Sequence, residues 1–517
     1  MVARCQKLRT LAERPARGGV EAARPIRADH RANRHEPRAQ VDEFSEERLL
    51  DDAVNGLGRA DPDASAARPA APWIGWSFAA IGLLIVVEFI IGSRIALTAL
   101  FGLSTLLSFA MLALRLMSFR ELALPAAAAG VPVTPDPLPV FTILVPLYHE
   151  AAVVRQLLTA LDAIDYPKQR LDILLIVEVS DAETAGAIAC ADPGPHVRTI
   201  VVPDGQPRTK PRALNYGMAF ARGQFVVVFD AEDQPEPDQL TKALAAFRAG
   251  PPELGCVQAR LNIYNPSDSW LTRQFTIEYT AQFDGLLPAV ERARLPILLG
   301  GTSNYFRREA LDAVHGWDPF NVTEDADLGL RLARAGYQVL VLDSTTWEEA
   351  PSRFGVWYGQ RTRWLKGWMQ TWLVHMRRPR RLWRELGARR FFGFQAQTGG
   401  VILSALVHPL FLAIVAIDAA AGTLFTSGDG IGAAILRWMA LLNLIASYGV
   451  TMALGGAAVA ARGRARLAIH AVLLPVYWLA ISFAAYRALW QLFRAPYYWE
   501  KTMHNTRAAT SPSTRRQ

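Results

Sequence analysis

The hydrophobic positions of this chain form two kinds of run, and each kind predicts a different class of structure. Apolar runs of about 20 residues, the length that a helix needs to cross a bilayer, cover residues 73–92, 96–117, 400–417, 436–460 and 467–489, and Glu88 interrupts the first of them. Between the second and third of these, the apolar runs shorten to about four to eight residues and alternate with segments of helical period. The pattern therefore predicts a soluble domain inserted between two groups of transmembrane helices.

The short apolar runs predict buried strands at residues 140–145, 173–177, 197–202 and 225–229. Helical segments separate these runs, and strands that alternate with helices are typical of α/β domains with a mostly parallel sheet. Polar and charged side chains follow the strands, at the edge where open α/β sheets bind ligands. This part of the chain therefore predicts a nucleotide-binding α/β domain with its site at that edge.

Three carboxylates, Asp230, Glu232 and Asp233, come directly after the last of these strands. Carboxylates packed this closely repel one another unless a cation joins them, and hard divalent cations prefer oxygen ligands. The cluster therefore predicts a site for a divalent metal that carries a phosphate-bearing ligand. A solvated acidic turn is the alternative that these residues leave open, because Pro235 and Pro237 follow at once.

No G-x-G-x-x-G or Walker sequence follows a predicted strand, which argues against a dinucleotide-binding fold and a P-loop ATPase. A diphosphate would instead be neutralised by a metal and by cations such as Lys210 and Arg363. Two further polar segments lie at residues 323–325 (Thr-Glu-Asp) and 360–364 (Gln-Arg-Thr-Arg-Trp). Taken singly, the first indicates a helix N-terminus and the second an amphipathic helix on a membrane surface.

The cysteine spacing and the charge distribution indicate the environment in which the protein works. The three cysteines, Cys5, Cys190 and Cys256, lie far apart, which excludes a disulfide framework and favours a reducing environment for the soluble part. The net charge of +8 is concentrated in the first 40 residues, beside the apolar runs and in the tail. Lipid headgroups explain this distribution better than nucleic acid does.

The remaining segments complete the expected organisation. In chain order we expect a disordered tail (1–72, with room for a short helix at 41–54), a transmembrane hairpin (73–117), a linker (118–137), the catalytic domain (138–367), interfacial amphipathic helices (368–398), a transmembrane bundle (399–490) and a basic tail (491–517). Removing residues 1–70 should then leave activity largely intact.

The topology of the C-terminal part stays open. Three crossings after a cytoplasmic domain would place the tail outside, whereas its basic residues favour the cytoplasm. Either the run at 467–489, which contains Pro475, is bent or re-entrant, or residues 391–417 hold more than one embedded piece.

The order and spacing of the motifs resemble those of the processive, membrane-integrated family 2 glycosyltransferases, which include cellulose, chitin and hyaluronan synthases. The family motifs D-x-D, T-E-D and Q-x-x-R-W are matched in order by Asp230-Ala231-Glu232, Thr323-Glu324-Asp325 and Gln360-x-x-Arg363-Trp364. Residues 499–504 are similar to a tail in bacterial exopolysaccharide synthases of this group.

The resemblance implies a GT-A-type α/β domain, with a mixed, mostly parallel sheet and flanking helices, between the two transmembrane groups. It implies donor-binding residues Tyr148, Glu150, Glu178, Asp181, Lys210 and Arg363. It implies metal-binding residues Asp230, Glu232 and Asp233 for Mg²⁺ or Mn²⁺, a catalytic group of Asp325 with Glu324 and Thr323, and acceptor-binding residues Trp364 and Gln360.

Two departures from the family pattern leave assignments open. The second acid of D-x-D is Glu232, so either it or Asp233 would ligate the metal. A paired Asp-Asp at the second strand is replaced by Glu178-Val179-Ser180-Asp181, so either acid could meet the uridine.

The implied function is inverting polymerisation of a hexose from UDP-glucose or a similar UDP-hexose into a β-linked exopolysaccharide. The partners would be the UDP-sugar donor, the growing polysaccharide, membrane lipids and periplasmic or outer-membrane export proteins, without nucleic acid. The enzyme would lie in the bacterial inner membrane with its catalytic domain cytoplasmic. The alternatives are a non-processive transferase acting on a polyprenyl or other lipid, and a non-catalytic membrane-anchored sugar-nucleotide sensor.

Overall fold

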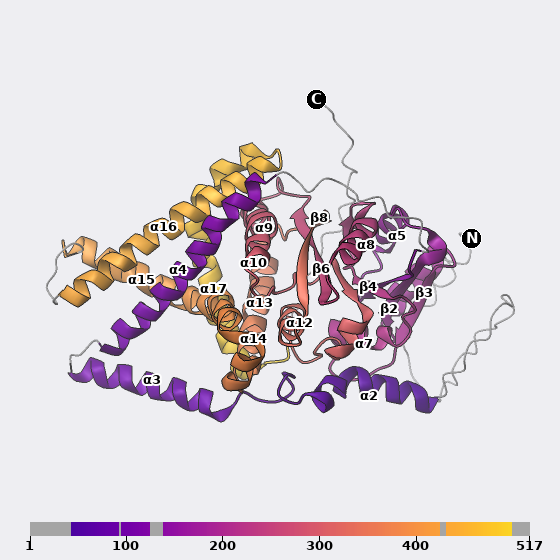
Figure 1. Ribbon diagram of the computed structural model, residues 1–517, viewed down its shortest axis with the longest axis horizontal. Coiled ribbons are helices and arrows are strands. Elements are labelled where there is room, and N and C mark those ends of the chain that lie inside the picture. Colours follow the sequence, from indigo (N-terminus) through magenta and orange to yellow (C-terminus); the bar gives the residue numbers. More distant parts are fainter. Residues whose placement is uncertain (1–42, 92–94, 125–137, 424–430, 499–517) are drawn as a thin grey trace, which may run out of the picture.

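The structure is a computed structural model that describes residues 43–91, 95–124, 138–423 and 431–498. An α/β domain forms one half of the molecule, and long apolar helices project from it on the opposite side (Figure 1). The expected tail at 1–42, the greater part of the linker (125–137) and the segment 499–504 lie outside the described residues.

Eight strands of the described residues form one sheet, in the order β3-β2-β1-β4-β7-β6-β8-β5. The strands are β1 (Phe141–Leu147), β2 (Leu171–Glu178), β3 (Val197–Val202), β4 (Phe225–Val228), β5 (Gln234–Pro235), β6 (Leu254–Ile263), β7 (Asn304–Arg307) and β8 (Gln338–Glu348). β1 pairs in parallel with both β2 and β4, and β2 pairs in parallel with β3. β7 is antiparallel to β4 and to β6, which confirms the expected mixed, mostly parallel sheet.

Two apolar layers hold the sheet, because alternate residues of each buried strand point to opposite faces. Ile143 of β1 packs on one face, whose helices are α5 (Val154–Asp162), α6 (Ala182–Ala191) and α8 (Gln239–Ala249). Leu144 packs on the other face, whose helices include α7 (Lys210–Met218), α9 (Trp270–Thr280), α12 (Glu324–Arg334) and α13 (Phe354–His375). The second face carries the candidate site.

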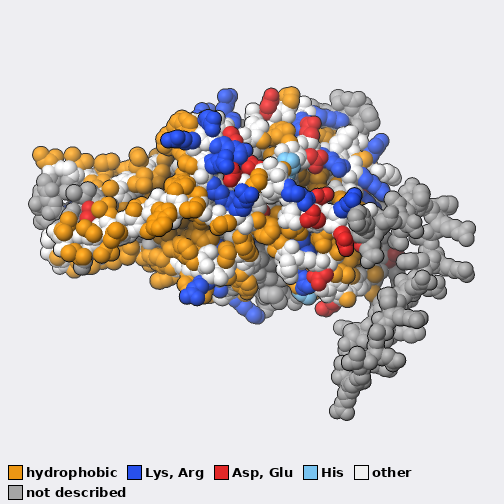
Figure 2. All heavy atoms as spheres, turned by 90° about the horizontal axis from the view of Figure 1, so that it is seen from below, with side chains coloured by type: hydrophobic (Ala, Val, Ile, Leu, Met, Phe, Trp, Pro, Cys, Tyr) orange, Lys and Arg blue, Asp and Glu red, His pale blue; other side chains and the backbone are white. Residues whose placement is uncertain are grey.

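Long apolar helices flank this domain in the sequence. They are α3 (Pro72–Ile91) and α4 (Ile95–Ala123) before it, and α15 (Val401–Ala420), α16 (Ile431–Ala461) and α17 (Leu474–Arg494) after α14 (Pro379–Phe394). Among the described residues, four helical segments are long and apolar enough to cross a membrane: 102–123, 379–420, 434–461 and 465–494. Hydrophobic side chains cover this end of the molecule, and charged side chains gather over the α/β domain (Figure 2). Because α4 continues to Ala123, the linker begins later than residue 118.

The last apolar run has two different faces. Ala484, Ala485 and Ala488 of α17 are buried against α13, while Trp490 and Phe493 are exposed. Beyond the helix, the carbonyl oxygens of Ala495 and Tyr498 accept hydrogen bonds from Lys366 on α13, at 3.3 and 2.6 Å. The run therefore packs on α13 of the α/β domain, although residues 465–494 are also long and apolar enough to cross a membrane.

The N-terminal segment corrects an expectation. Residues 43–72, assigned from the sequence to a disordered tail, contain α2 (Glu43–Ala60) and an ordered connection to α3. Leu50, Ala53 and Leu57 recur at helical spacing and make an apolar stripe. Leu50 and Ala53 belong to the apolar layer that includes α7, Leu57 is also buried, and Asn215 Nδ2 of α7 donates to the Ala53 carbonyl (3.0 Å). Low overall hydrophobicity hid this stripe within an Arg- and Ala-rich segment.

Candidate active site

A cavity of about 380 Å³, here called the donor cavity, opens at the carboxyl ends of β1, β2 and β4. Of the residues predicted from the sequence, those that line it are Tyr148, Glu150, Glu178, Lys210, Asp230, Glu232, Thr323, Glu324, Asp325, Gln360, Arg363 and Trp364. Segments that are far apart in the sequence thus converge on one hollow. Asp181 and Asp233 are the two predicted residues that do not line it.

Asp181 and Glu178 have different surroundings. Asp181 caps α6 by accepting from the Thr184 N–H (3.1 Å), and it also accepts from the His149 N–H (2.5 Å). Glu178 pairs with the buried Arg212, and burial still raises the pKa of Glu178 above its ordinary value. Of the two candidates for the uridine, Glu178 therefore faces the cavity, whereas Asp181 holds the loop that carries Glu150.

The acids after β4 also divide into two groups. Asp233 is buried and its Oδ2 accepts from the Asp230 N–H (2.7 Å) and from the Thr302 hydroxyl, so it braces the turn. Asp230 faces the cavity and pairs with Lys210, which also donates to the Gly301 carbonyl (3.0 Å). Asp233 is therefore not part of a solvated acidic turn, because it is buried, and Asp230 and Glu232 present their carboxylates to the cavity.

The carboxylates of Asp230, Glu232, Asp233 and Glu348 lie close enough to disfavour one another's ionised form. Burial, together with Asp230 and Glu232, raises the pKa of Asp233 well above its ordinary value. Burial and the same acids raise the pKa of Glu348, which also lines the cavity. Within the described part of the chain, Asp233 Oδ1 and Glu348 Oε1 are buried without a hydrogen-bond partner. A cation in this cluster would relieve that repulsion.

The residues fit a divalent cation that arrives with its ligand. Among the described residues no group of three or more His, Cys, Asp or Glu side chains is assembled as a complete metal site. Mg²⁺ commonly takes one or two carboxylates and completes its shell with substrate phosphates and water. Asp230 and Glu232 supply such a pair at the cavity wall.

The carboxylates of the T-E-D segment stand at the start of α12. Thr323 occupies the N-cap position but its side chain makes no capping hydrogen bond, and Glu324 and Asp325 form the first turn. Burial raises the pKa of Asp325, and burial together with Asp325 raises the pKa of Glu324 to about 7. Gly301 has a φ of 91°, and a Cβ there would lie 2.8 Å from Asp325 Oδ2. The glycine therefore allows the backbone to approach the acid.

The Q-x-x-R-W segment lies within α13, where positions three and four apart share a face. Gln360, Arg363 and Trp364 accordingly all line the donor cavity. The Trp364 ring stacks on Tyr279, with centroids 6.2 Å apart and an interplanar angle of 22°. Burial lowers the pKa of Arg363, and Glu324 and the neighbouring acids oppose this shift. Because an arginine is effectively always protonated in proteins, Arg363 presents a positive charge to these acids.

Sequence reasoning missed the partners of this helix. Arg361 lies over the Trp364 ring at 4.6 Å and pairs with Glu278 of α9, and Tyr477 of α17 donates to the same carboxylate (2.9 Å). This network of Arg361, Glu278 and Tyr477 holds the Trp364 ring in position. The basic residue inside the motif was its only signal, since Glu278 and Tyr477 belong to segments with no motif.

A second cavity of about 320 Å³, the bundle cavity, lies between α4, α15, α16 and α17 and shares Glu278, Gln282, Arg361, Trp364 and Trp368 with the donor cavity. Polar side chains line it at helical spacing: Ser104 and Ser108, Ser404 and His408, and Asn443, Ser447 and Thr451. Arg115 also lines it, 5.7 Å from the Trp478 ring centroid. The apolar helices thus turn their polar residues toward one interior space, which sequence reasoning missed.

Comparison with known proteins identifies the α/β domain. A model of the family described as "Glycosyltransferase like family 2" matches residues 137–367. The probable glycosyltransferase YdaM of Bacillus subtilis is 29% identical over 238 residues, which cover 44% of this chain and 55% of YdaM. The beta-monoglucosyldiacylglycerol synthase of Synechocystis is 28% identical over 273 residues (51% of this chain, 55% of the synthase). The probable glucomannan 4-beta-mannosyltransferase 1 of Arabidopsis thaliana is 27% identical over 251 residues (47% and 45%).

The chain spans about half the length of the curated relatives it matches. Among solved structures, it is similar to the mannosyltransferase PcManGT of Pyrobaculum calidifontis in complex with GDP-Man and Mn²⁺. The identity is 22%, the TM-score is 0.48, and the match covers 72% of this chain and 99% of the other. The expected GT-A-like arrangement of sheet and helices is thus confirmed. Residues 137–367 therefore match the family 2 glycosyltransferases, and long apolar helices lie on both sides of this domain in the sequence.

Proposed function

We propose that this enzyme transfers a hexosyl group from a nucleoside diphosphate sugar to the terminal hydroxyl of a glycan that extends into the membrane helices. The continuity of the two cavities carries the proposal. Trp364 and Trp368 line both, so an acceptor in the bundle cavity can present its end to the donor. Hydroxyl, amide and imidazole side chains facing an interior space suit a hydroxyl-rich chain, whereas a lipid tail requires none of them.

The transfer is a single displacement. Asp325 accepts the proton of the acceptor hydroxyl, whose oxygen forms a bond to the anomeric carbon while the bond to the diphosphate oxygen breaks. The diphosphate leaves with the bonding electrons, and Arg363 and Lys210 stabilise its negative charge. A divalent cation held by Asp230 and Glu232, Mg²⁺ or Mn²⁺, would supply further positive charge to this leaving group.

The raised pKa of Asp325 supports its role as the base, because a carboxylate in a buried site is a better proton acceptor than one in water. One displacement inverts the anomeric centre, so an α-linked donor gives a β-linked product. We propose a UDP-hexose such as UDP-glucose as the donor, with Glu178, Glu150 and Tyr148 at the nucleoside. Trp364 offers an aromatic face to the acceptor sugar, which suits a chain that advances by one residue per cycle.

The setting follows from the same proposal. We place the catalytic domain on the cytoplasmic side of a bacterial inner membrane, since the basic residues of α14 lie beside the apolar helices. The product would then pass through the helices to periplasmic or outer-membrane export proteins.

A second candidate is transfer of a single sugar to a lipid. The apolar walls of the bundle cavity, such as Leu444, Phe411 and Val407, favour it, and so does the likeness to a protein named as a beta-monoglucosyldiacylglycerol synthase. A non-catalytic sensor is disfavoured, because a sensor does not require a buried base beside the donor cavity.

The test uses the full chain in lipid nanodiscs with labelled UDP- and GDP-hexoses and either Mg²⁺ or Mn²⁺. We expect a water-soluble polymer that linkage-specific β-glycosidases degrade. A labelled product that partitions into chloroform and carries one sugar would favour the lipid acceptor. No transfer from any donor, with UDP still bound, would overturn both.

A further inference from the structure

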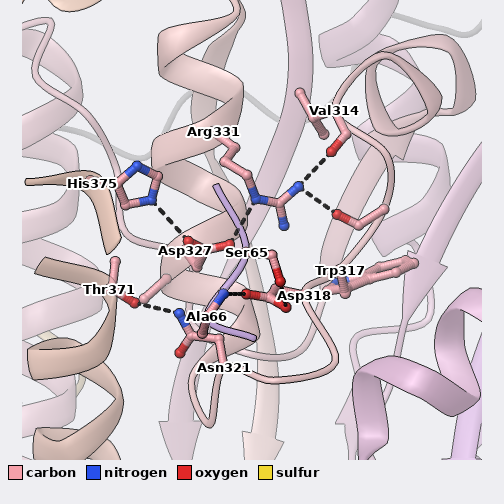
Figure 3. A network of polar contacts seen from close by, with 12 residues as sticks. Ser65, Ala66, Val314, Trp317, Asp318, Asn321, Asp327, Arg331, Thr371 and His375 are labelled. Carbon is pink, nitrogen blue, oxygen red and sulfur yellow. Dashed lines mark hydrogen bonds and ion pairs between the residues drawn. The ribbon is translucent and has the colours of Figure 1, made fainter. Parts of the chain in front are cut away.

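Residues 61–69, which connect α2 to α3 and are here called the N-terminal strap, are held by a buried carboxylate. Asp318 accepts from the Ala66 N–H (2.5 Å) and from the Ser65 hydroxyl (3.2 Å). Figure 3 shows the strap entering a polar cluster in which Asp318 lies beside Asp327 and Arg331. Asp318 is fully buried, so the strap supplies hydrogen bonds that water cannot.

The opposite side of the strap is held by cations. Arg377, just beyond α13, donates to the carbonyl oxygens of Asp63 (3.0 Å) and Ser65 (2.7 Å). Arg381 of α14 pairs with Asp61 (2.8 Å), and the Tyr497 hydroxyl donates to the Ala66 carbonyl (3.1 Å). The strap therefore joins parts of the chain that are hundreds of positions apart.

The carboxylate that receives the strap begins the loop that carries the catalytic acids. Asp318 precedes Glu324 and Asp325 by one short loop, and the Pro319 carbonyl in that loop accepts from the Thr209 hydroxyl (3.1 Å). Thr209 adjoins Lys210, which pairs with Asp230 in the donor cavity. The loop thus connects the strap to the proposed base and to the donor lysine.

Charge makes this contact costly to lose. Burial and the neighbouring Asp327 raise the pKa of Asp318 to about 6. Asp327 is itself held by Arg331 (2.7 Å) and by His375 (2.8 Å). A buried carboxylate that loses its donors must move toward water or take up a proton, and either change displaces the loop.

We propose that the N-terminal strap is a positioning element for sugar transfer, with Asp318 and Arg377 as positioning residues that hold the loop before α12 in register with the donor cavity. This inference rests on the proposed function. It also reverses the expectation that residues 1–70 are dispensable, because Ser65 and Ala66 of the strap bond to Asp318, which begins the loop before the proposed base.

The test introduces Asp318→Asn or Arg377→Gln into the full chain. A shift of about 1 Å in a catalytic group costs on the order of 10²-fold in rate, so we expect kcat to fall between about tenfold and 10²-fold. The Kd for UDP should stay within about twofold, because no donor-cavity residue is changed. Arg377→Lys retains the charge and should restore part of the rate.

The matched control is Arg59→Gln, which removes an arginine of α2 just before the strap, whose partners Asp51 and Asp52 are exposed on α2 itself. It should leave kcat unchanged. An unaltered kcat in Arg377→Gln, or an equal loss in Arg59→Gln, would overturn the proposal. Because Asp318→Asn can also impair folding, the proposal is judged on Arg377→Gln, which changes a half-buried residue that contacts the strap from outside.

Hydrogen exchange separates this inference from the proposed function. Residues 318–327 should exchange faster in Arg377→Gln than in the wild type, whether or not any sugar is transferred. Equal exchange in the two proteins would overturn the strap's role. Absence of transfer by the wild type, with the exchange difference present, would overturn the proposed function alone.

Discussion

The donor cavity and the bundle cavity share a wall, yet they are built in opposite ways. The donor cavity is dense in charge, with Lys210 and Arg363 facing the carboxylates after β4 and at the start of α12. The bundle cavity is mostly apolar, and its polar lining residues include Ser108, Ser447 and His408 together with the arginines Arg115 and Arg361. Under the proposed function, the contrast separates two tasks: the donor cavity would stabilise charge during the reaction, and the bundle cavity would accommodate a neutral, hydroxylated acceptor.

Among the substitutions that test this contrast, Asp325→Asn in the donor cavity should have the largest effect on kcat. Loss of a general base costs roughly 10² to 10⁴ in rate, so kcat should fall by that range while the Kd for UDP stays nearly unchanged. Calorimetry and initial rates measure the two quantities. Unchanged turnover would remove Asp325 from the mechanism and leave Glu324 as the candidate.

Trp364 stands on the shared wall, and Trp364→Ala should reduce kcat/KM for the acceptor by about tenfold, since an aromatic contact is worth about 0.5–1.5 kcal/mol and 1.4 kcal/mol is tenfold. The KM for the donor should change little. Trp364→Phe keeps a ring and is the matched control. Because Trp364 also packs on Tyr279, thermal melting must show that the variant is folded.

A smaller effect is expected inside the bundle. Ser447→Leu should shorten the product or raise the acceptor KM by about threefold, the value of a single net hydrogen bond. The control is Ile445→Leu, two residues away on the exposed face of α16, where 70% of the side chain is accessible. Equal effects of the two variants would mean that the bundle cavity does not contact the acceptor.

The smallest expected change is a shift of the acid limb in the pH profile of kcat/KM. Asp325 must be ionised to accept a proton, and burial raises its pKa above the ordinary 3.8. As the pH falls through this raised pKa, the base becomes protonated and kcat/KM declines. The acid limb should therefore lie above pH 3.8. A limb at or below pH 3.8 would contradict the buried base.

The same contrast explains what the sequence could predict. The first four strands follow from contiguous apolar runs, and the predicted residues that line the donor cavity follow from motifs at the ends of strands and helices. The roles of Asp181 and Asp233 could not be predicted, because a cap and a ligand have the same sequence signature. Hydrogen bonds from the Thr184 N–H and the Thr302 hydroxyl are what distinguish them.

Features that depend on contacts between distant segments escaped prediction. The polar lining of the bundle cavity comes from four helices, and each contributes only residues such as Ser404 and His408 to an otherwise apolar run. A short helix was expected at 41–54, but the extension of α2 to Ala60 and its packing against α7 could not be predicted from local pattern. The strap contact with Asp318 joins positions that no local pattern relates.

The packing of α17 against α13 has a consequence for handling the protein. One face of α17 supports the helix that carries Arg363 and Trp364, and the other presents Trp490 and Phe493 outward. Whatever amphiphile surrounds the purified enzyme therefore forms the outer support of the catalytic helix. Detergent micelles and bilayers of different thickness should give different specific activities from the same folded chain, so reconstitution is part of the assay.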